Sequence, residues 1–189
     1  FSQRKDVINS DKIFEYSDQF LEEILEDTLK LRDQKSINLK KNDFDNRIKL
    51  IIGKNYKETE FNDLISLNNN EFKKEIFKKF NESRGERIKI LGEDQSKEVE
   101  KRIFLQAIDL NWKSHIQYLE QLRQVIGLRS YGQRDPLVEY KKEAFELFEN
   151  LLYKLKIDYL TILLNLKVLE NKNNDIKKEN KQISENPKC

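Results

Sequence analysis

The sequence predicts an all-α protein, and three observations support this prediction. Apolar residues recur at three- and four-residue steps over long stretches, as they do along one face of an α-helix. Five glycines and two prolines among 189 residues leave few of the turns that a β architecture needs. Hydrophobic and charged residues each make up 37% of the chain, which suits long helices that bury one stripe and expose the rest. We expect a small helical bundle and a long antiparallel two-helix hairpin packed with a further helix. A disordered C-terminal tail should follow.

Residues 1–32 are predicted to be mainly one helix. Ser17 or Asp18 is expected to interrupt it as a cap. The apolar stripe of this helix consists of Ile13, Phe14, Phe20, Leu21, Ile24, Leu25 and Leu29.

Residues 33–96 carry a shorter pattern, which predicts a small bundle of short helices. Gly53, the Asn68-Asn69-Asn70 run, Gly85 and Gly92 punctuate this segment. The apolar clusters are Ile48, Leu50, Ile51 and Ile52, then Phe61, Leu64, Ile65 and Leu67, then Phe72, Ile76, Phe77 and Phe80.

Residues 97–169 are predicted to form two long amphipathic helices that fold back on each other as an antiparallel hairpin. At 1.5 Å per residue the two rods would be roughly 45 and 50 Å long. The first stripe is Leu105, Ile108, Trp112, Ile116, Leu119, Leu122 and Ile126. The second stripe is Tyr140, Ala144, Phe148, Leu151, Leu155, Ile162, Leu166 and Leu169. Residues 170–189 are polar and lack periodicity, so they are predicted to be a flexible linker.

A polar loop joins the two rods, and it is the candidate contact site. Asp135 followed by Pro136 predicts an N-cap with proline at the first helical position. Tyr131 lies where the rods meet and no core should reach it, so it is a candidate for contact with another chain. The alternative is a tyrosine folded back on its own loop. The candidate contact residues are Arg129, Ser130, Tyr131, Gly132, Gln133 and Arg134.

Several classes of function find no support in the residues. The net charge of +2, with acidic residues interspersed among the basic ones, argues against a nucleic-acid partner. The chain lacks a glycine-rich phosphate loop and a run of roughly 18 apolar residues that could span a bilayer. His115 and Cys189, one of each, cannot complete a zinc site, so His115 is interpreted as structural at the edge of the hairpin seam. Trp112 is expected to pack in the core. The absence of methionine predicts that the sequence is a piece of a longer protein.

The hairpin residues resemble those of the SecA family, the motors of bacterial protein export. The family pattern reads W-[KR]-E-H-L, then L-R, then I-x-L-R-x-Y-x-Q-x-D-P-x-x-E-Y-K, with E-[AS]-F close behind. The matching residues are Trp112-Lys113-Ser114-His115, Leu122-Arg123, the run from Leu128 to Pro136, Glu139-Tyr140-Lys141 and Glu143-Ala144-Phe145. The chain departs from the pattern at Ser114, Leu119 and Glu120, which stand where glutamate, methionine and aspartate are usual.

The resemblance implies names and roles for these segments. Residues 1–32 would be the end of the long scaffold helix, 33–96 the helical wing, 97–169 the two-helix finger and 170–189 the start of the C-terminal linker. The finger tip would contact unfolded preprotein and the SecYEG channel, while upstream nucleotide-binding domains hydrolyse ATP with Mg. The parent would be a translocating ATPase, peripheral on the cytoplasmic face of the bacterial inner membrane. This segment itself is expected to carry no catalytic residue and no cofactor.

Two further implications remain open. In many relatives the linker ends in a zinc module that binds the chaperone SecB. Cys189 stands where its first ligand would be, but the rest of the motif is absent, so no metal site is predicted in this chain.

The alternative function is a cytosolic all-helical scaffold or adaptor without a membrane partner.

Overall fold

The computed structural model describes residues 12–33, 38–52, 57–128 and 135–168, and these residues are almost entirely helical. No strand occurs among them, as the sequence predicts. The helices are α2 (Ile13–Asp33), α3 (Asn38–Ile52), α4 (Glu58–Ser66), α5 (Asn69–Leu91), α6 (Glu93–Val125) and α7 (Pro136–Asn165).

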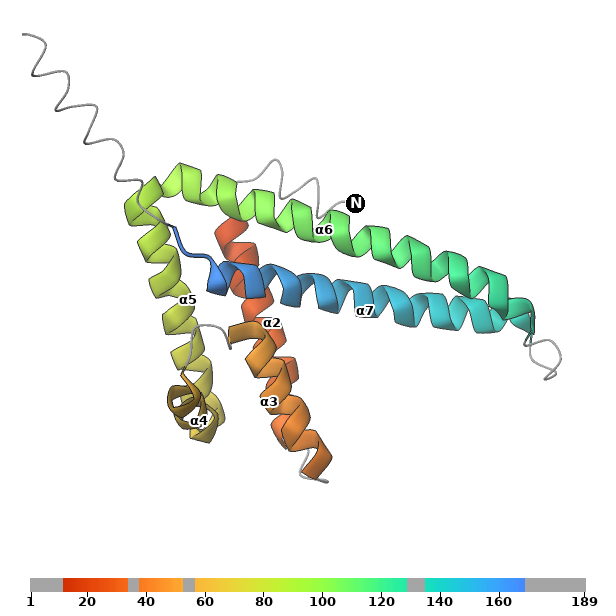
Figure 1. Cartoon of the computed structure of the whole chain (residues 1–189), viewed down its shortest axis with the longest axis horizontal. Coiled ribbons are helices and arrows are strands. Elements are labelled where there is room, and N and C mark those ends of the chain that lie inside the picture. The colour runs from red at the N-terminus through yellow and green to blue at the C-terminus, as the bar shows by residue number, and fades with distance from the viewer. Residues whose placement is uncertain (1–11, 34–37, 53–56, 129–134, 169–189) are drawn as a thin grey trace, which may run out of the picture.

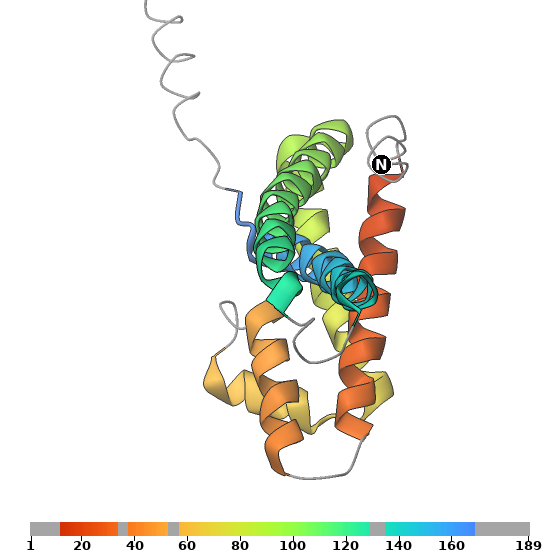
Figure 2. The same cartoon turned by 90° about the vertical axis from the view of Figure 1, so that its right-hand side faces the viewer.

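The long helices α6 and α7 lie side by side and antiparallel (Figure 1). We call this pair the hairpin. Helices α2, α3 and α5 pack against its base, crossing it at a steep angle, and α4 packs on the far end of α5 (Figures 1 and 2). The distal half of the hairpin projects beyond the other described helices (Figure 1). The predicted bundle and antiparallel hairpin are confirmed. The division of the chain at residues 32, 96 and 169 into separate domains stays a prediction.

Helix α2 contradicts the expected interruption at Ser17 or Asp18, because it continues through both residues to Asp33. The Ser17 hydroxyl lies 2.8 Å from the Ile13 carbonyl oxygen one turn earlier. Its side chain is therefore held by its own helix and by tertiary contacts, and it leaves the backbone ladder intact. Serine is a residue type that favours caps, but Ser17 bonds to Glu100 and Tyr159, which lie far away in the sequence. The local sequence therefore does not reveal its role.

Helix α5 begins and ends at sequence signals, but one expected break is absent. Asn68 is the N-cap, and its side chain accepts a hydrogen bond from the Glu71 backbone N–H at 2.9 Å. Gly92 ends the helix at φ 86°, which turns the chain directly into α6. Gly85 lies inside α5, so the prediction of a break there is wrong. A lone glycine weakens a helix by only about 1 kcal/mol, which the surrounding packing can outweigh.

The core is one cluster of apolar side chains at the base of the hairpin, drawn from all six helices. At its centre the Phe104 ring lies 5.7 Å from that of Phe20 and 5.2 Å from that of Tyr159. These three residues come from α6, α2 and α7. The base of the hairpin is therefore packed on several sides, whereas among the described residues only the two helices of the hairpin bury side chains in its distal half.

This difference corrects the predicted stripe of α6. Trp112 was expected in the core, but its side chain is 44% exposed, and Ile116 is 48% exposed. Leu122 of the predicted stripe is buried, but the neighbouring positions Asn111 and His115 take the seam places expected of Trp112 and Ile116. A single facing helix covers only a narrow strip of its partner, so the edges of a broad apolar stripe stay in contact with solvent.

The C-terminal boundary of the hairpin is also earlier than predicted. Helix α7 ends at Asn165, and Leu166 adopts extended backbone angles. The Asn165 amide donates to the backbone oxygens of Thr161 (2.7 Å) and Ile51 (3.3 Å), which ties the end of α7 to α3. Leu169 and the predicted tail, 170–189, lie outside the described residues.

Gly85 within α5 and Gly92 at its C-terminal end allow a matched test of this description. An alanine at position 92 would be forced to a positive φ, so Gly92→Ala should lower the free energy of unfolding by about 1–3 kcal/mol. Gly85→Ala should raise it by about 0.5–1 kcal/mol, because the added methyl group meets no atom within 4 Å and alanine favours the helix. Urea unfolding measures both. Shifts of the same sign would show that the backbone assignment at one of the two positions is wrong.

Candidate functional site

A buried carboxylate connects four helices at the base of the hairpin. Glu100 of α6 is completely buried, and one of its oxygens, Oε1, accepts from Arg87 Nη2 (2.8 Å) and Arg84 Nε (3.3 Å), both on α5. The other oxygen, Oε2, accepts from the hydroxyl of Ser17 on α2 at 2.9 Å. The Ser17 hydroxyl also lies 2.6 Å from that of Tyr159 on α7. We call Ser17, Arg84, Arg87, Glu100 and Tyr159 the polar node.

The direction of the hydroxyl contacts follows from the number of available protons. Ser17 has one hydroxyl proton, and the Glu100 carboxylate and the Ile13 carbonyl can only accept it. Tyr159 must therefore donate to Ser17. Burial, reinforced by the Glu100 charge, raises the pKa of Tyr159 far above its usual value, so its hydroxyl stays protonated.

The two arginines reach beyond Glu100. Arg84 also donates to Asp18 at 2.8 Å, and its guanidinium lies over the rings of Phe14 and Phe80, 4.5 and 4.7 Å from their centroids. Two guanidinium groups thus face two carboxylates, one fully buried and one partly exposed. Such an arrangement tolerates burial because each charge has an opposite partner and directed hydrogen bonds.

Arg87 performs a second task at the end of α7. Its Nη1 donates to the Leu163 carbonyl at 3.1 Å and to the Ser83 hydroxyl at 2.9 Å. Leu163 lies in the last turn of α7, where carbonyl groups have no partner within the helix. One side chain therefore joins the C-terminal turn of α7 to α5 and, through Glu100, to α6.

Sequence reasoning missed the polar node, because the chain has 34 acidic residues and pairs of charges at helical spacing are uninformative. One signal was present. Glu100 lies four residues before Phe104, so the apolar face of α6 continues onto a carboxylate. A charge on the buried face of a helix requires a partner, and only tertiary structure reveals which one.

The seam of the distal hairpin is mixed in character. The His115 ring is buried, with ring centroids at 5.6 Å from Trp112 and 6.1 Å from Phe148 on the facing helix. The Asn111 amide donates to Asp158 at 2.9 Å across the seam. Leu122 is buried further toward the tip. The prediction that His115 is a structural seam residue is consistent with this position.

The tip of the hairpin is described only in part. Asp135 caps α7 by accepting from the Leu137 backbone N–H at 2.8 Å, and Pro136 is the first helical residue, as the sequence predicts. The candidate contact residues Arg129, Ser130, Tyr131, Gly132, Gln133 and Arg134 lie outside the described residues. The described residues that flank them, at the end of α6 and the start of α7, lie beside each other at the far end of the hairpin (Figure 1).

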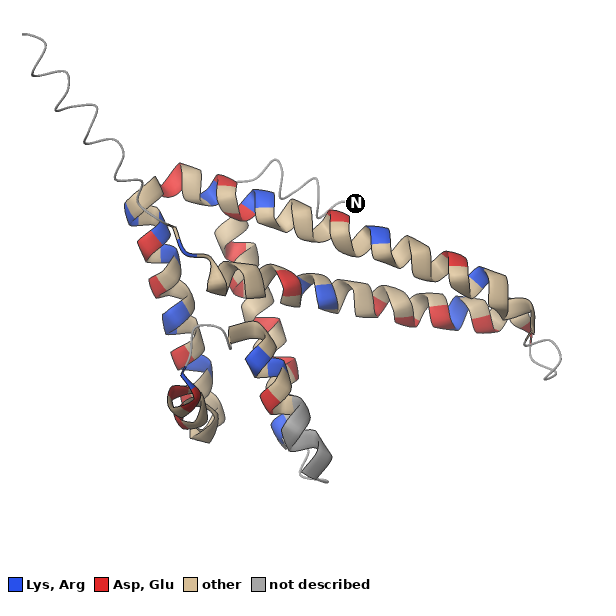
Figure 3. Ribbon diagram, viewed as in Figure 1, with Lys and Arg blue, Asp and Glu red and all other residues tan. Residues whose placement is uncertain are grey.

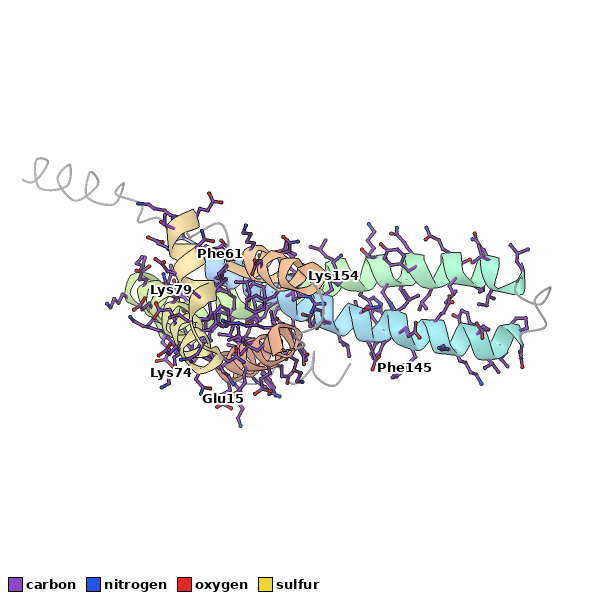
Figure 4. All side chains as sticks on the ribbon, turned by 90° about the horizontal axis from the view of Figure 1, so that it is seen from below. Glu15, Phe61, Lys74, Lys79, Phe145 and Lys154 are labelled. Atoms are coloured by element: carbon purple, nitrogen blue, oxygen red, sulfur yellow. The ribbon has the colours of Figure 1, made fainter. Side chains whose placement is uncertain are left out.

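The distal hairpin also exposes apolar side chains. Figure 4 shows the outer part of the hairpin as two helices without cover from other described elements, with Phe145 on α7 there. Phe145 is 60% exposed, and Tyr118 on α6 is 56% exposed.

Within the described ranges no group of three or more histidine, cysteine, aspartate or glutamate side chains is arranged to hold a metal ion. Of the helices that the structure describes, none combines the length and hydrophobicity required of a bilayer-spanning segment. Cys189 lies outside the described residues.

Comparison with known proteins decides the family. The SecA Wing and Scaffold domain family matches residues 1–167. The chain belongs to this family. The protein translocase subunit SecA of Pelagibacter ubique is 59% identical over 190 residues, which cover 100% of the chain and 22% of that relative. The SecA subunit of Wigglesworthia glossinidia brevipalpis is 34% identical over 89% of the chain, and that of Thermodesulfovibrio yellowstonii 33% identical over 90%.

The chain spans only about a fifth of the length of these SecA relatives, 22% and 21% of two of them. The described residues match this part of the relatives. They form a packed base held by a polar node and a two-helix hairpin that extends from it.

The seam assignment gives a matched pair of substitutions. Leu122→Asp should lower the free energy of unfolding by about 3 kcal/mol or more, because it buries an unpaired charge between α6 and α7. Val125→Asp lies three residues further along α6, where the side chain is 52% exposed, and should change stability by about 0.5 kcal/mol or less. Circular dichroism and thermal melting report both. Equal melting of the two variants would place the seam elsewhere.

His115 should give the hairpin a pH-dependent stability. Burial lowers the pKa of His115 below its usual value of about 6.5, so the unfolded chain takes up the proton first as the pH falls. The stabilisation is complete above about pH 6.5 and decreases as the pH falls toward the lower pKa of the folded state. Between pH 7.5 and about 5.5, the parent should lose more unfolding free energy than His115→Gln in urea titrations. An identical loss in both proteins would contradict burial of this ring.

Proposed function

We propose that this chain is the wing and scaffold part of a SecA protein-export motor. Its hairpin contacts unfolded preprotein and the SecYEG channel, while nucleotide-binding domains elsewhere in the parent hydrolyse ATP with Mg. One combined observation carries this proposal. The chain matches the family along residues 1–167, and the described hairpin brings the flanks of the family's tip sequence together at its far end.

The hairpin has the mechanical properties that such a contact requires. Helix α6 has 33 residues, which corresponds to roughly 50 Å, and its first half contributes Phe104 and Ala107 to the core. A rod held firmly at one end transmits a displacement to its other end. The cap at Asp135 and the proline at 136 define where the second rod begins, and so keep the connecting loop short.

The tip residues have chemistry suited to contact with many sequences. Tyr131 offers an aromatic face and a hydroxyl, which together can touch apolar side chains and backbone groups without a shape-specific pocket. Arg129 and Arg134 would face acidic or carbonyl groups at the channel mouth. A motor that moves many different preproteins needs this kind of non-selective contact.

The proposal places the parent on the cytoplasmic face of the bacterial inner membrane as a peripheral protein. A zinc module that binds SecB would follow Cys189 if the parent carries the C-terminal motif of many relatives.

The alternative function is an all-helical adaptor without a membrane partner. An adaptor needs no particular sequence at the hairpin tip, whereas the run from Leu128 to Pro136 follows the family pattern closely. A nucleic-acid partner is disfavoured by charge. Lysine and arginine alternate with aspartate and glutamate along the described helices, so no continuous basic stripe appears in Figure 3.

Transport by tip variants tests the proposal. The segment would replace its equivalent in the full-length Pelagibacter ubique relative, and preprotein import would be measured in vesicles that contain SecYEG. Tyr131→Phe should retain most transport, because the aromatic face remains, and Tyr131→Ser should lose most of it. Tyr118→Ser is the matched control, since Tyr118 is an exposed tyrosine on the shaft of the same hairpin.

The outcome distinguishes the two functions. Loss of transport in Tyr131→Ser but not in Tyr118→Ser supports contact through the tip. Equal transport by Tyr131→Ser and Tyr131→Phe would remove the tip contact and favour the adaptor.

A further inference from the structure

We propose that the polar node is a positioning device that sets the direction of the hairpin relative to α5. In this role Arg84, Arg87 and Glu100 are positioning residues, because the geometry of their hydrogen bonds fixes how the helices are oriented. The part of the inference that concerns transport rests on the proposed function, because the direction of the hairpin can affect transport only if the parent is a translocation motor.

The first argument is the number of helices that meet at one side chain. Glu100 of α6 accepts from α5 through Arg84 and Arg87 and from α2 through Ser17. Tyr159 brings α7 to the same point through Ser17. Apolar contacts in the surrounding core are non-directional, so they tolerate small rotations and slides. Hydrogen bonds to a buried carboxylate weaken steeply with angle, so they fix one arrangement of the four helices.

The second argument concerns the free-energy cost of burying the charged side chains of the node. A buried ion pair is weak evidence of stability, because apolar residues of similar volume often stabilise a protein as well or better. Here two arginines and a glutamate lie nine-tenths or more buried among aromatic side chains. An apolar substitute would fill the same space. An apolar side chain could not donate the two directed hydrogen bonds that Arg87 makes, one to Glu100 on α6 and one to the Leu163 carbonyl on α7.

The third argument is leverage. From Glu100 to the end of α6 at Val125 the rod extends roughly 40 Å. A rotation of about 10° at the base would therefore displace the far end of α6 by about 7 Å, more than one helical turn. The distal hairpin projects beyond the other described helices (Figure 1), so its direction has to be set near its base.

The test separates positioning from stability. The triple variant Arg84→Met, Arg87→Met, Glu100→Leu removes every charge of the node and leaves Tyr159 and Ser17 hydrogen-bonded to each other. Spin labels would be placed at cysteines replacing Lys78 on α5 and Gln121 on α6, both exposed, with Cys189→Ser removing the native thiol. The distance distribution between the labels reports the direction of the hairpin in the full chain.

We expect the triple variant to melt within about 4 °C of the parent, because apolar side chains replace the buried ions at little cost in stability. The α5–α6 distribution should nevertheless broaden or shift. Labels at Gln121 and Lys142, which span the hairpin itself, should keep the parent distance and show that the hairpin is intact. A narrow, parent-like α5–α6 distribution in the triple variant would overturn the proposal.

A second variant keeps the test decisive if the triple variant does not fold. Arg87→Lys retains the charge but loses the planar fork, whose two terminal nitrogens contact Glu100 and Leu163 separately. The α5–α6 distribution should broaden although the charge balance is unchanged, and a parent-like distribution would again overturn the proposal. Lys73→Met is the matched control, because it removes two ion pairs between α5 and α2 outside the node and should leave the distances unchanged.

Transport by the same variants connects the device to the motor. In the full-length chimera, the triple variant should lose most transport although it stays folded, and Lys73→Met should retain it. Full transport together with a broadened distribution would overturn the positioning role. If the parent chimera itself fails to transport preprotein, the proposed function fails, whereas the distance measurements still decide whether the node directs the hairpin.

Discussion

The architecture depends on a single buried carboxylate. Glu100 is completely enclosed, and its two oxygens accept hydrogen bonds from Arg84, Arg87 and Ser17 on two neighbouring helices. Removing Glu100 would leave the buried guanidinium of Arg87 without its carboxylate partner. The helices therefore have to arrive at this point together. The orientation of α2, α5 and α7 around the base of α6 follows from that requirement as much as from the apolar core.

The two halves of the hairpin therefore bury their side chains in different ways. Near its base, side chains such as Phe104 and Tyr159 are buried from several directions and belong to the common core. Beyond Asn111 the facing helix is the only described element that covers α6, so burial is confined to a narrow seam that includes His115 and Leu122. The exposed apolar residues of the distal half are a consequence of this geometry. A hairpin held at one end and uncovered at the other is suited to reach a partner outside the described helices.

The sequence predicted those features that depend on local chemistry. The helical class, the breaks at the Asn68-Asn69-Asn70 run and at Gly92, the Asp135 cap and the antiparallel hairpin all follow from periodicity and from residues with defined backbone preferences. Features that depend on tertiary partners were predicted wrongly or missed. Trp112 has an apolar side chain on a helical stripe, yet it lies at the edge of a seam that only one helix covers. Ser17 resembles a cap in sequence but bonds to Glu100, 83 residues away.

Native-state hydrogen exchange tests the central claim most directly, because it measures the free energy of opening at each amide. If the polar node joins the helices into one unit, amides near Arg87 on α5, Glu100 on α6 and Tyr159 on α7 should exchange with the same, highest free energy. Amides of the distal hairpin, around Tyr118, should exchange at a lower free energy through local opening. The account would be contradicted if the amides near Arg87 opened well before those near Glu100, because α5 could then separate while the base of the hairpin stayed folded.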